Sequence, residues 1–411
     1  MKDYSQTDLF TLGKLYVSDF VAPDSPPRTQ PYELDLILTE DGAVRLKNVA
    51  PKDIMYGKYW YRSGITDTMK KELSNIVIDI LSTFKVTSGD IWLDIASNDG
   101  TLLKNVPSMC YRLGIDPADD SYKQEAEKHS DEIIQDYFSV SSYRRAKCGD
   151  KKAKVITTIA MFYDLEDPDS FVRDIHEVLD DNGLWVVQLS YTPLMLQQLA
   201  FDNICHEHIF YYSLFNLKAL MNRNGFDVVN VQLNDINGGS FRVYMMKSVA
   251  DKTKYGSQPH RDVCDFMINS ILAYEKTLGL DDPKTWTDFF SRINALKQKT
   301  LEFIKAEKAK GKTIWGYGAS TKGNTLLQYF QLDSSMIDAI AERSPFKYGL
   351  YTAGSNIPIL SEEEMRKANP DYLLVFPWHF INEFVEREKE YLKQGGKFVV
   401  PCPKFEIIGG I

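Results

Sequence analysis

Hydrophobic positions in the middle of the chain form short apolar runs that are separated by segments with helical spacing. The apolar runs have the length of strands and occupy residues 91–96, 111–116, 154–160, 184–190, 226–233 and 241–247. Helical spacing is found at 169–179 and in the segment that ends at Gly225. Strands that alternate with helices in this way predict a parallel sheet with helices on both faces.

A second alternation of the same kind begins near residue 313. Its strands are expected at 313–317, 336–342, 371–377 and 397–401, and its helices at 321–330, 362–368 and 381–392. A stretch with helical spacing over residues 258–307 separates the two alternations. We therefore expect an α/β fold with two doubly wound units, at 71–250 and 306–411, joined by helices.

The first seventy residues differ from both units because they are rich in strand and turn signals. Residues Glu40–Ala43 predict a hairpin turn between strands at 32–38 and 44–49. A helix is expected over 71–88, where one face carries Leu73, Ile76, Val77, Ile80 and Leu81. We place the domain boundaries at 1–70, 71–250 and 251–411, the last of which includes the helical linker.

Composition narrows the class of protein. The chain has 411 residues, with 48 Lys and Arg against 57 Asp and Glu, so the net charge is -9. An acidic chain without a basic block argues against general nucleic-acid binding. No apolar run reaches the length of a membrane span, and the start lacks the pattern of a signal peptide. Five cysteines without a CxxC pair exclude a cysteine-rich zinc site, and we expect a reduced, cytoplasmic protein.

Small and acidic residues follow the first strand of the larger unit, from Asp94 to Gly100. Small residues allow a sharp turn close to a ligand, and Asp116 at the end of the next strand can accept both ribose hydroxyls of a nucleoside. Because two acids would repel a pyrophosphate, S-adenosylmethionine suits this loop better than a dinucleotide. The alternative is a plain strand–turn–helix connection with solvated acids.

Histidine and tyrosine gather in the segment Cys205–Tyr212. If the segment is extended, His206 and His208 share one face and Glu207 points away. A histidine is easily poised as a base near neutral pH. Structural histidines or a metal site are the alternatives.

A glycine-rich loop, Gly316–Asn324, follows an apolar strand and opens a helix. A helix N-terminus with close backbone approach and one lysine, Lys322, can hold a phosphate. Arg343, Lys347 and Gly354 follow the next strand and could complete an anion pocket; a tight turn with surface lysines is the alternative.

An aromatic cluster near residue 60 and a glycine-containing segment near residue 238 are two further candidate sites. Tyr56, Tyr59, Trp60 and Tyr61 precede Arg62, and such an aromatic cluster is equally consistent with packing. The segment from Asn237 to Arg242 could bring backbone close to a substrate or form a plain hairpin turn.

Several separated motifs occur together in one order: DIASNDGTLL, HEHIFYYS, GGSFRVY, GYGASTKGNTLLQY, KYGLYTAGSNIPI and PDYLLVFPW. In this order the chain resembles, from about Tyr32 to Ile408, the sugar C-methyltransferases that act on nucleotide-linked 4-keto-deoxysugars. The resemblance implies a small N-terminal domain, a Rossmann-like class I methyltransferase domain and a C-terminal Rossmann-like domain that helps to hold the nucleotide sugar.

The resemblance also implies roles for individual residues. It makes His208 the base, with Glu207 and an N-terminal tyrosine nearby, which is Tyr59 or Tyr61, and we favour Tyr59. The residues expected to hold S-adenosylmethionine, or its product S-adenosylhomocysteine, are Ser63, Asp94, Ala96, Asn98, Asp99, Gly100, Asp116 and Pro117. The residues expected at the nucleotide sugar are Tyr211, Asn237, Arg242, Ser320, Lys322, Asn324, Arg343, Lys347 and Tyr351.

The sequence departs from the family pattern in four places. Residues 38–42 stand where the family carries zinc-binding cysteines, and residues 1–109 contain no cysteine, so we expect no zinc. Cys205 stands where a tyrosine is usual, Asn237 where a histidine is common, and His379 where an asparagine is common.

The expected function is C-methylation at C3 of a nucleotide-linked 4-keto-deoxysugar, through an enolate that a base generates. N- or O-methylation of a related nucleotide sugar, and a binding protein that has lost catalysis, remain alternatives. A dinucleotide oxidoreductase is disfavoured because neither glycine loop reads GxGxxG. The expected partner is a nucleotide-diphosphate sugar, not nucleic acid or membrane, and the chain is expected to be a monomer or weak homo-oligomer.

Overall fold

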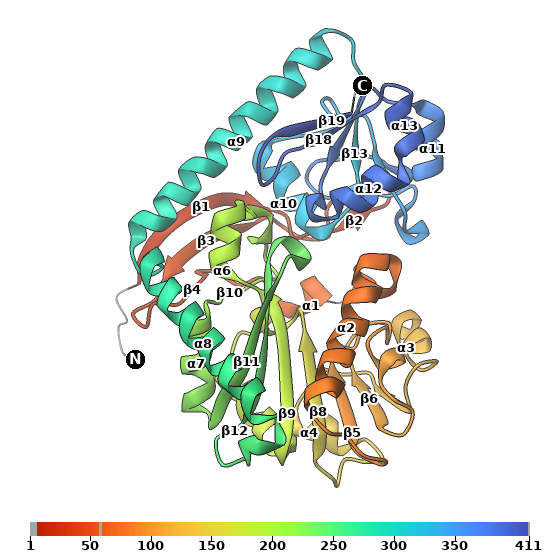
Figure 1. The fold of residues 1–411 in the computed structure, drawn as a ribbon. Helices are drawn as coiled ribbons and strands as arrows, with labels where there is room; N and C mark the ends of the chain where they lie inside the picture. The colour runs from red at the N-terminus through yellow and green to blue at the C-terminus, as the bar shows by residue number, and fades with distance from the viewer. Residues whose placement is uncertain (1–5, 57–59, 410–411) are drawn as a thin grey trace.

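The computed structural model describes residues 6–56 and 60–409 as two α/β units stacked on each other, with a strand-rich N-terminal segment along their side (Figure 1). We call them the central unit, which holds the seven-stranded sheet, and the C-terminal unit, which holds the six-stranded sheet. The α/β fold class predicted from the sequence is confirmed.

The central sheet has the order β11-β12-β9-β8-β5-β6-β7. Neighbouring strands pair in parallel from β9 to β7, whereas β12 is antiparallel to both β9 and β11. The strands are β5 (Ile91–Ile95), β6 (Tyr111–Ile115), β7 (Glu132–Ile134), β8 (Ala153–Ile159), β9 (Leu179–Ser190), β11 (Phe226–Asn234) and β12 (Ser240–Lys247).

Both faces of this sheet are buried, as the uninterrupted apolar strands predict. Successive side chains of β5 enter different cores: Leu93 packs with residues of α5 and α7, and Trp92 packs with residues of α2. The helices of this unit are α2 (Asp67–Thr83), α3 (Asp120–Ala126), α4 (Val140–Arg144), α5 (Pro168–Val178), α6 (Thr192–Gln198) and α7 (Leu214–Arg223).

Helix α2 begins earlier and ends earlier than the predicted helix over 71–88. Thr66 caps it, since its side chain accepts a hydrogen bond from the backbone N–H of Met69. Leu81 was predicted on the buried face, but it is 36% exposed, whereas Ile80 is fully buried. The predicted stripe was therefore one position too wide.

The C-terminal sheet has the order β16-β14-β13-β17-β18-β19, and only β19 runs against its neighbour. Its strands are β13 (Ile314–Tyr317), β14 (Ile340–Glu342), β16 (Ile359–Ser361), β17 (Tyr372–Val375), β18 (Lys397–Val400) and β19 (Glu406–Gly409). Its helices are α10 (Thr321–Phe330), α11 (Glu362–Ala368), α12 (Ile381–Arg387) and α13 (Lys389–Lys393).

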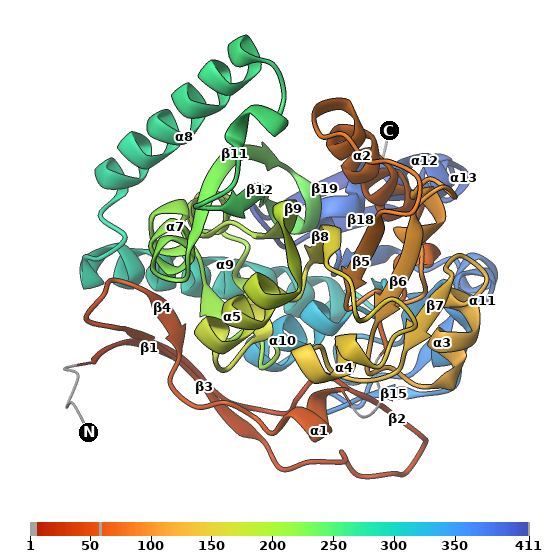
Figure 2. The same ribbon diagram turned by 90° about the horizontal axis from the view of Figure 1, so that it is seen from below.

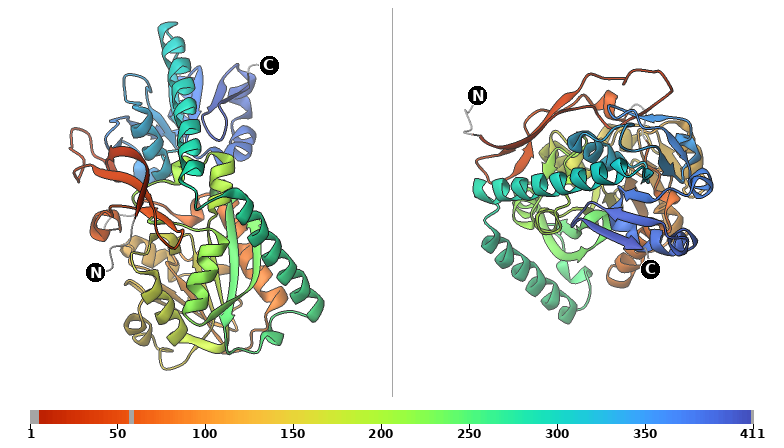
Figure 3. Two further views of the ribbon diagram at one scale, coloured as in Figure 1. Left: turned by 90° about the vertical axis from the view of Figure 1, so that its left-hand side faces the viewer. Right: turned by 90° about the horizontal axis from the view of Figure 1, so that it is seen from above.

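Two long helices, α8 (Gln258–Leu278) and α9 (Pro283–Ala309), connect the units, where one helical stretch was predicted. The chain breaks at Gly279, which takes a left-handed conformation with φ 59° at the end of α8. Asp282 then caps α9, and Pro283 occupies its first turn. Helix α9 runs along the outside of the C-terminal unit, and α8 runs beside the central unit (Figure 3).

The N-terminal segment forms a four-stranded sheet of order β1-β3-β4-β10 along one side of the molecule (Figure 2). Three strands come from the first fifty residues, and β10 comes from the histidine-bearing segment of the central unit. The sheet consists of β1 (Thr7–Leu15), β3 (Tyr32–Leu38), β4 (Val44–Leu46) and β10 (Phe210–Tyr211). The predicted turn between β3 and β4 forms, with Thr39 N–H bonded to the carbonyl of Ala43.

A second pairing joins the N-terminal segment to the C-terminal unit, because β2 (Phe20–Val21) pairs with β15 (Tyr351–Thr352). Helix α1 (Lys52–Tyr56) precedes the undescribed residues 57–59. The 3₁₀ turns are η1 (Ser63–Ile65), η2 (Leu103–Asn105), η3 (Phe162–Asp164), η4 (Phe201–Asn203), η5 (Ile236–Gly238), η6 (Lys252–Lys254), η7 (Pro345–Lys347) and η8 (Trp378–Phe380).

Candidate active site

The loop after β5 has the backbone of a close-approach turn. Ala96 and Asn98 have positive φ angles of 58° and 52°, and Gly100 has φ 76°. A Cβ on Gly100 would lie 2.8 Å from the Cα of Ala126 in α3, so only glycine fits there. The loop therefore turns sharply at the carboxyl end of β5 and lies tightly against α3, where ligands of open α/β sheets bind.

Two carboxylates stand at the carboxyl ends of the neighbouring strands β5 and β6. Asp94 is buried and accepts a hydrogen bond of 2.6 Å from Thr157 Oγ1, and its burial raises its pKa to about 7. Asp116 is half-buried and accepts 2.8 Å bonds from the N–H groups of Asn98 and Ala118; desolvation raises its pKa above the usual range. Each oxygen of Asp116 keeps a lone pair for a further donor such as a ribose hydroxyl.

The residues of this loop fit S-adenosylmethionine. The buried Ser97 Oγ has no hydrogen-bond partner within the described chain, and buried polar atoms of this kind call for a ligand or water. Pro117 follows Asp116 and is half-buried at the same edge. Asp94 and Asp116 would hold the amino-acid and ribose parts.

The side chains of Asn98 and Asp99 instead form hydrogen bonds to the backbone of another segment of this chain. The Asn98 amide donates to the carbonyl of Tyr61 at 3.0 Å and accepts from the N–H of Ser63 at 3.0 Å. Asp99 accepts from the N–H of Gly64 at 2.8 Å. These side chains therefore fix the segment 61–64 against the loop after β5, residues 96–100, which we call the cofactor loop. Tyr59, the favoured N-terminal tyrosine, lies outside the described residues.

In the segment Cys205–Tyr212, which we call the histidine segment, residues 205–208 form a turn, because His208 N–H bonds to the carbonyl of Cys205 at 3.2 Å, and Phe210–Tyr211 form β10. The extended conformation in which His206 and His208 would share a face is therefore not present. His206 Nε2 instead donates to the carbonyl of Tyr32 in β3 at 3.3 Å, and burial lowers its pKa to about 4. His206 thus anchors the N-terminal sheet.

His208 has the geometry of a neutral base. Its Nδ1 donates to the carbonyl of Asn203 at 2.7 Å, which leaves the lone pair on Nε2. Its ring packs on Tyr163 with centroids 4.1 Å apart. Burial and the ammonium group of Lys322 lower the pKa of His208 to about 3, so the imidazole is neutral at physiological pH.

Lys322, from the C-terminal unit, bonds to the same residue, Asn203, as His208 does. It lies in the first turn of α10, and its Nζ donates to Asn203 Oδ1 and, at 3.2 Å, to the carbonyl of Asn237. Beside it, Trp378 Nε1 donates to Asp202 at 3.2 Å. The two units therefore meet at the histidine segment.

Buried polar atoms without a hydrogen-bond partner among the described residues gather around these groups. They are Asp202 Oδ1, Asn203 Nδ2, Glu207 Oε2, Tyr211 Oη and His379 Nδ1. A cavity of about 10 Å³ borders His208, Asn203, Tyr211 and Tyr163. Burial raises the pKa of Glu207 and lowers that of His379 to about 3. Such a group of unsatisfied donors and acceptors is typical of a polar substrate site.

Arg242 requires a correction. Its guanidinium is buried and donates to Gln188 at 2.9 Å, to Glu72 at 2.7 Å and to Asp79 at 2.6 Å. These bonds tie β12 to α2, so the predicted contact with the substrate is replaced by a structural ion-pair network. The carboxylates of Glu72 and Asp79 offset the free-energy cost of burying the guanidinium.

Lys347 also differs from the prediction, because its buried Nζ donates to the carbonyl of Ala319 at 2.7 Å and supports the glycine loop from behind. Ser320 caps α10 through a 2.9 Å bond from Gly323 N–H. Arg343 is exposed, and its Nη1 lies 3.6 Å from Oε1 of Glu383. Tyr351 lies in β15 and is half-buried.

Asn324 occupies the inner side of α10. Its Nδ2 donates to the carbonyl of Asp19 at 3.2 Å, while its Oδ1 is buried without a partner within the described chain. Ser355 Oγ is buried and equally unpartnered, and Ala353 N–H also bonds to the carbonyl of Asp19. Sequence motifs indicated the glycine loop, but Asp202, Asn203 and Ser355 carry no signal in the sequence alone.

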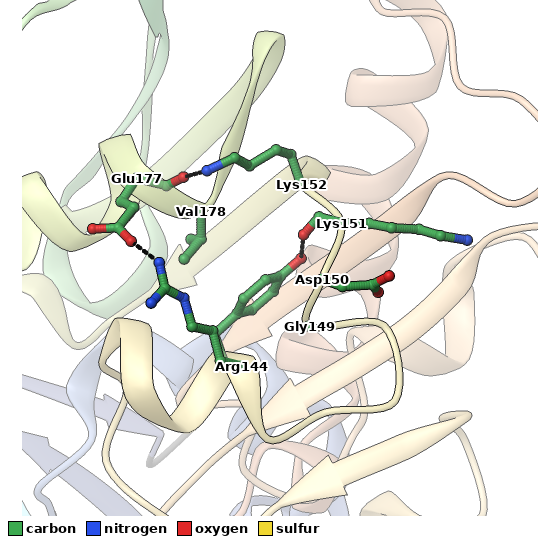
Figure 4. A pocket seen from close by; sticks show the side chains of 8 residues that line it. Arg144, Gly149, Asp150, Lys151, Lys152, Glu177 and Val178 are labelled. Atoms are coloured by element: carbon green, nitrogen blue, oxygen red, sulfur yellow. Dashed lines mark hydrogen bonds and ion pairs between the residues drawn. The ribbon is translucent and has the colours of Figure 1, made fainter.

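A wider cavity, of about 360 Å³, lies at the amino ends of strands β8 and β9 of the central sheet (Figure 4). It is bordered by the end of α4, the loop 149–152 before β8 and the end of α5. Two of its cations bind Glu177: Arg144 pairs with the carboxylate, and Lys152 donates to the backbone carbonyl. Because ligands of parallel sheets bind at the carboxyl ends, this cavity is not the active site.

Within residues 6–56 and 60–409, no group of three or more His, Cys, Asp and Glu side chains is arranged to hold a metal ion. None of the described helices combines the length and the apolar character needed to cross a bilayer.

Comparison with known proteins adds family information. Residues 68–231 match the model of a methyltransferase domain, and residues 235–403 match that of a C-methyltransferase C-terminal domain. The C-methyltransferase NovU of Streptomyces niveus is 29% identical over 364 residues, which cover 88% of this chain and 84% of NovU.

Solved structures are more distant. A plantazolicin methyltransferase in complex with S-adenosylhomocysteine matches with a TM-score of 0.34 and 13% identity, over 43% of this chain and 83% of its own. A magnesium protoporphyrin IX methyltransferase from Synechocystis matches with a TM-score of 0.33 and 8% identity, over 46% and 86%.

The fold, the loop after β5 and the matched domain define an S-adenosylmethionine-dependent methyltransferase. Within that class, the matched C-terminal domain and the similarity to NovU indicate a C-methyltransferase.

Proposed function

We propose that this enzyme methylates C3 of a nucleotide-linked 4-keto-deoxysugar, with His208 as the base. The observation that carries the proposal is the fixed orientation of His208: its Nδ1 donates to the carbonyl of Asn203, so the lone pair is on Nε2, and the side chain borders a cavity beside buried polar atoms that lack partners among the described residues. A carbon next to a ketone is acidic enough for such a base once the resulting charge is stabilised.

The proton acceptor is surrounded by groups suited to a sugar. Glu207 Oε2 and Tyr211 Oη are buried without partners in the described structure, so they can bind sugar hydroxyls. S-adenosylmethionine, when bound by the loop after β5, supplies an electrophilic methyl group. Asp94 and Asp116 hold it, and the segment 61–64 covers the loop.

The C-terminal unit offers a place for the nucleotide end. The turn between β13 and α10 has Gly318 at φ 82°, and Asn324 Oδ1 and Ser355 Oγ are buried nearby without partners among the described residues. Carboxyl ends of parallel strands with glycine turns commonly hold nucleotides. A nucleotide sugar would thus extend from the C-terminal unit to His208, which supports this substrate class.

Product analysis tests the proposal. The enzyme is incubated with ¹³C-methyl S-adenosylmethionine and the 4-keto-6-deoxyhexoses of thymidine and cytidine diphosphate. The expected product carries the label on C3 in a C–CH₃ group, with equimolar release of S-adenosylhomocysteine. A label on oxygen or nitrogen would replace the proposal by its first alternative. Binding of both ligands without transfer would indicate a binding protein.

A further inference from the structure

Asn203 joins two groups that come from different units. Its carbonyl accepts the Nδ1 proton of His208 at 2.7 Å, and its side-chain oxygen accepts from the ammonium group of Lys322. One residue therefore fixes both the imidazole and the ammonium group. Burial and then the ammonium group of Lys322 hold the pKa of His208 low, which is consistent with the two groups lying close together.

The ammonium group of Lys322 is only partly used by the protein. It has three N–H donors, and the described structure gives it two acceptors, Asn203 Oδ1 and the carbonyl of Asn237. Burial lowers the pKa of Lys322, and the neighbouring carboxylate of Asp202 acts in the opposite direction, towards the charged form. One donor thus remains for a ligand beside His208.

The position of Lys322 separates it from the nucleotide end. Asn324, two residues further along α10, contacts the N-terminal segment at Asp19, whereas Lys322 contacts the central unit at Asn203 and Asn237. The two side chains therefore face different parts of the molecule. A diphosphate at the glycine loop would not need the ammonium group that stands next to the base.

We propose that Lys322 is the catalytic cation that stabilises the enolate oxygen, and that the C-terminal unit thereby completes the catalytic centre. This inference rests on the proposed function. It replaces the diphosphate contact that the sequence motif suggested for Lys322.

The step balances within the substrate and the two side chains. The C3–H bond breaks, and its proton moves to Nε2 of His208. The electron pair of that bond forms the C3–C4 double bond, and the pair from the C4 carbonyl remains on oxygen as the oxyanion. The third N–H of Lys322 donates to this oxygen. A positioned donor to a developing oxyanion is worth about 10²–10³-fold in rate.

Three variants of the full-length enzyme test the role of the charge. Lys322→Gln keeps N–H donors for Asn203 and Asn237 but removes the charge, and Lys322→Arg keeps the charge. Arg292→Gln is the matched control, because Arg292 in α9 also bonds to carbonyls of the central unit, those of Leu196 and Gln197.

The readout is exchange of the C3 proton of thymidine diphosphate 4-keto-6-deoxyglucose with deuterated water, in the presence of S-adenosylhomocysteine. Lys322→Gln should slow exchange by about 10²–10³-fold, with nucleotide-sugar affinity within about threefold of wild type. Lys322→Arg should retain more exchange than Lys322→Gln, and Arg292→Gln should exchange like wild type. Calorimetric binding of S-adenosylhomocysteine confirms that each variant is folded.

Other outcomes overturn the inference. Wild-type exchange in Lys322→Gln would remove the cation from catalysis. A large loss of nucleotide-sugar affinity with normal exchange at saturation would return Lys322 to a phosphate role, and equal loss in both Lys322 variants and Arg292→Gln would make it a structural contact. Absence of exchange in wild type with the thymidine and cytidine substrates would reject the proposed function, and the inference with it.

Discussion

His206 and His208 illustrate how much a residue's partners decide. The sequence has one histidine on each side of Glu207, and either of them could act as a base. In the folded chain His206 bonds to β3, and His208 bonds to Asn203 beside Lys322. Burial keeps both imidazoles neutral at physiological pH, but only His208 borders the cavity with unsatisfied polar groups.

Arg242 shows where reasoning from sequence ends. A motif places it after a glycine pair, as a substrate-binding arginine would be. Its ion-pair partners are Glu72 and Asp79 in α2, more than 160 positions away. Such partners are fixed by the packing of α2 on the sheet, and no local pattern reports them.

At Asp116, the carboxylate is expected to bind both ribose hydroxyls of the cofactor. Replacing it by alanine removes a charged acceptor, so Asp116→Ala should weaken binding of S-adenosylhomocysteine by about 1–3 kcal/mol. Calorimetry measures the loss. Asp131→Ala is the control, since Asp131 pairs with Arg112 at the other end of β6; unchanged affinity in Asp116→Ala would exclude Asp116 from the site.

Among the elements, helix α2, the hairpin between β3 and β4, and both parallel sheets were predictable from periodicity and turn residues. The break between α8 and α9 carried its own signals, Gly279 and Pro283, yet the apolar spacing continues across it. Strand β10 was not predictable as part of the N-terminal sheet, because it contains two residues and pairs with Val44 and Arg45 far away in the sequence.

The hydrogen bonds between the cofactor loop and segment 61–64 can be tested by removing the side chain of Asn98. Asn98→Gly tolerates the positive φ angle but removes the bonds to Ser63 and Tyr61. At about 0.5–1.5 kcal/mol for each bond, the two bonds contribute about 1–3 kcal/mol, so amide hydrogen exchange at Ser63 should rise by roughly 5–160-fold.

Hydrogen exchange followed by mass spectrometry or NMR measures this change. Asn105→Ala is the control, because the side chain of Asn105 donates to the carbonyl of Thr101, four residues earlier, and not to segment 61–64 in the described structure. Unchanged protection at Ser63 in Asn98→Gly would show that the side chain does not hold the segment.

In the whole molecule, the N-terminal sheet is held by packing and by strand pairing. Phe10 stacks on Phe290 of α9 at 4.7 Å, β4 pairs with β10, and β2 pairs with β15. Contacts to both units thus hold the N-terminal sheet in place.

Removal of metal should therefore leave the protein intact. Overnight treatment with a chelator should not change the melting temperature or the affinity for S-adenosylhomocysteine, because the expected fold energy comes from buried apolar area and not from metal ligation. Elemental analysis of untreated protein that finds one zinc per chain, together with a lower melting temperature after chelation, would contradict this expectation.

The catalytic centre as a whole combines three parts of the chain, which the order of motifs suggested but could not place in space. In the proposed centre, segment 61–64 covers the cofactor loop, the histidine segment supplies His208 as the base, and α10 supplies Lys322. Contacts between units are set by shape and packing over long sequence separations, so they require the structure.

Proton exchange at the substrate carbon tests the account most directly. With S-adenosylhomocysteine in place of the methyl donor, wild type should exchange the C3 proton of a nucleotide-linked 4-keto-6-deoxyhexose with deuterated water. His208→Gln, which has no imidazole to accept that proton, should exchange it about 10²–10⁴-fold more slowly while binding S-adenosylhomocysteine normally. Exchange at the wild-type rate in His208→Gln would contradict the assignment of His208 as the base.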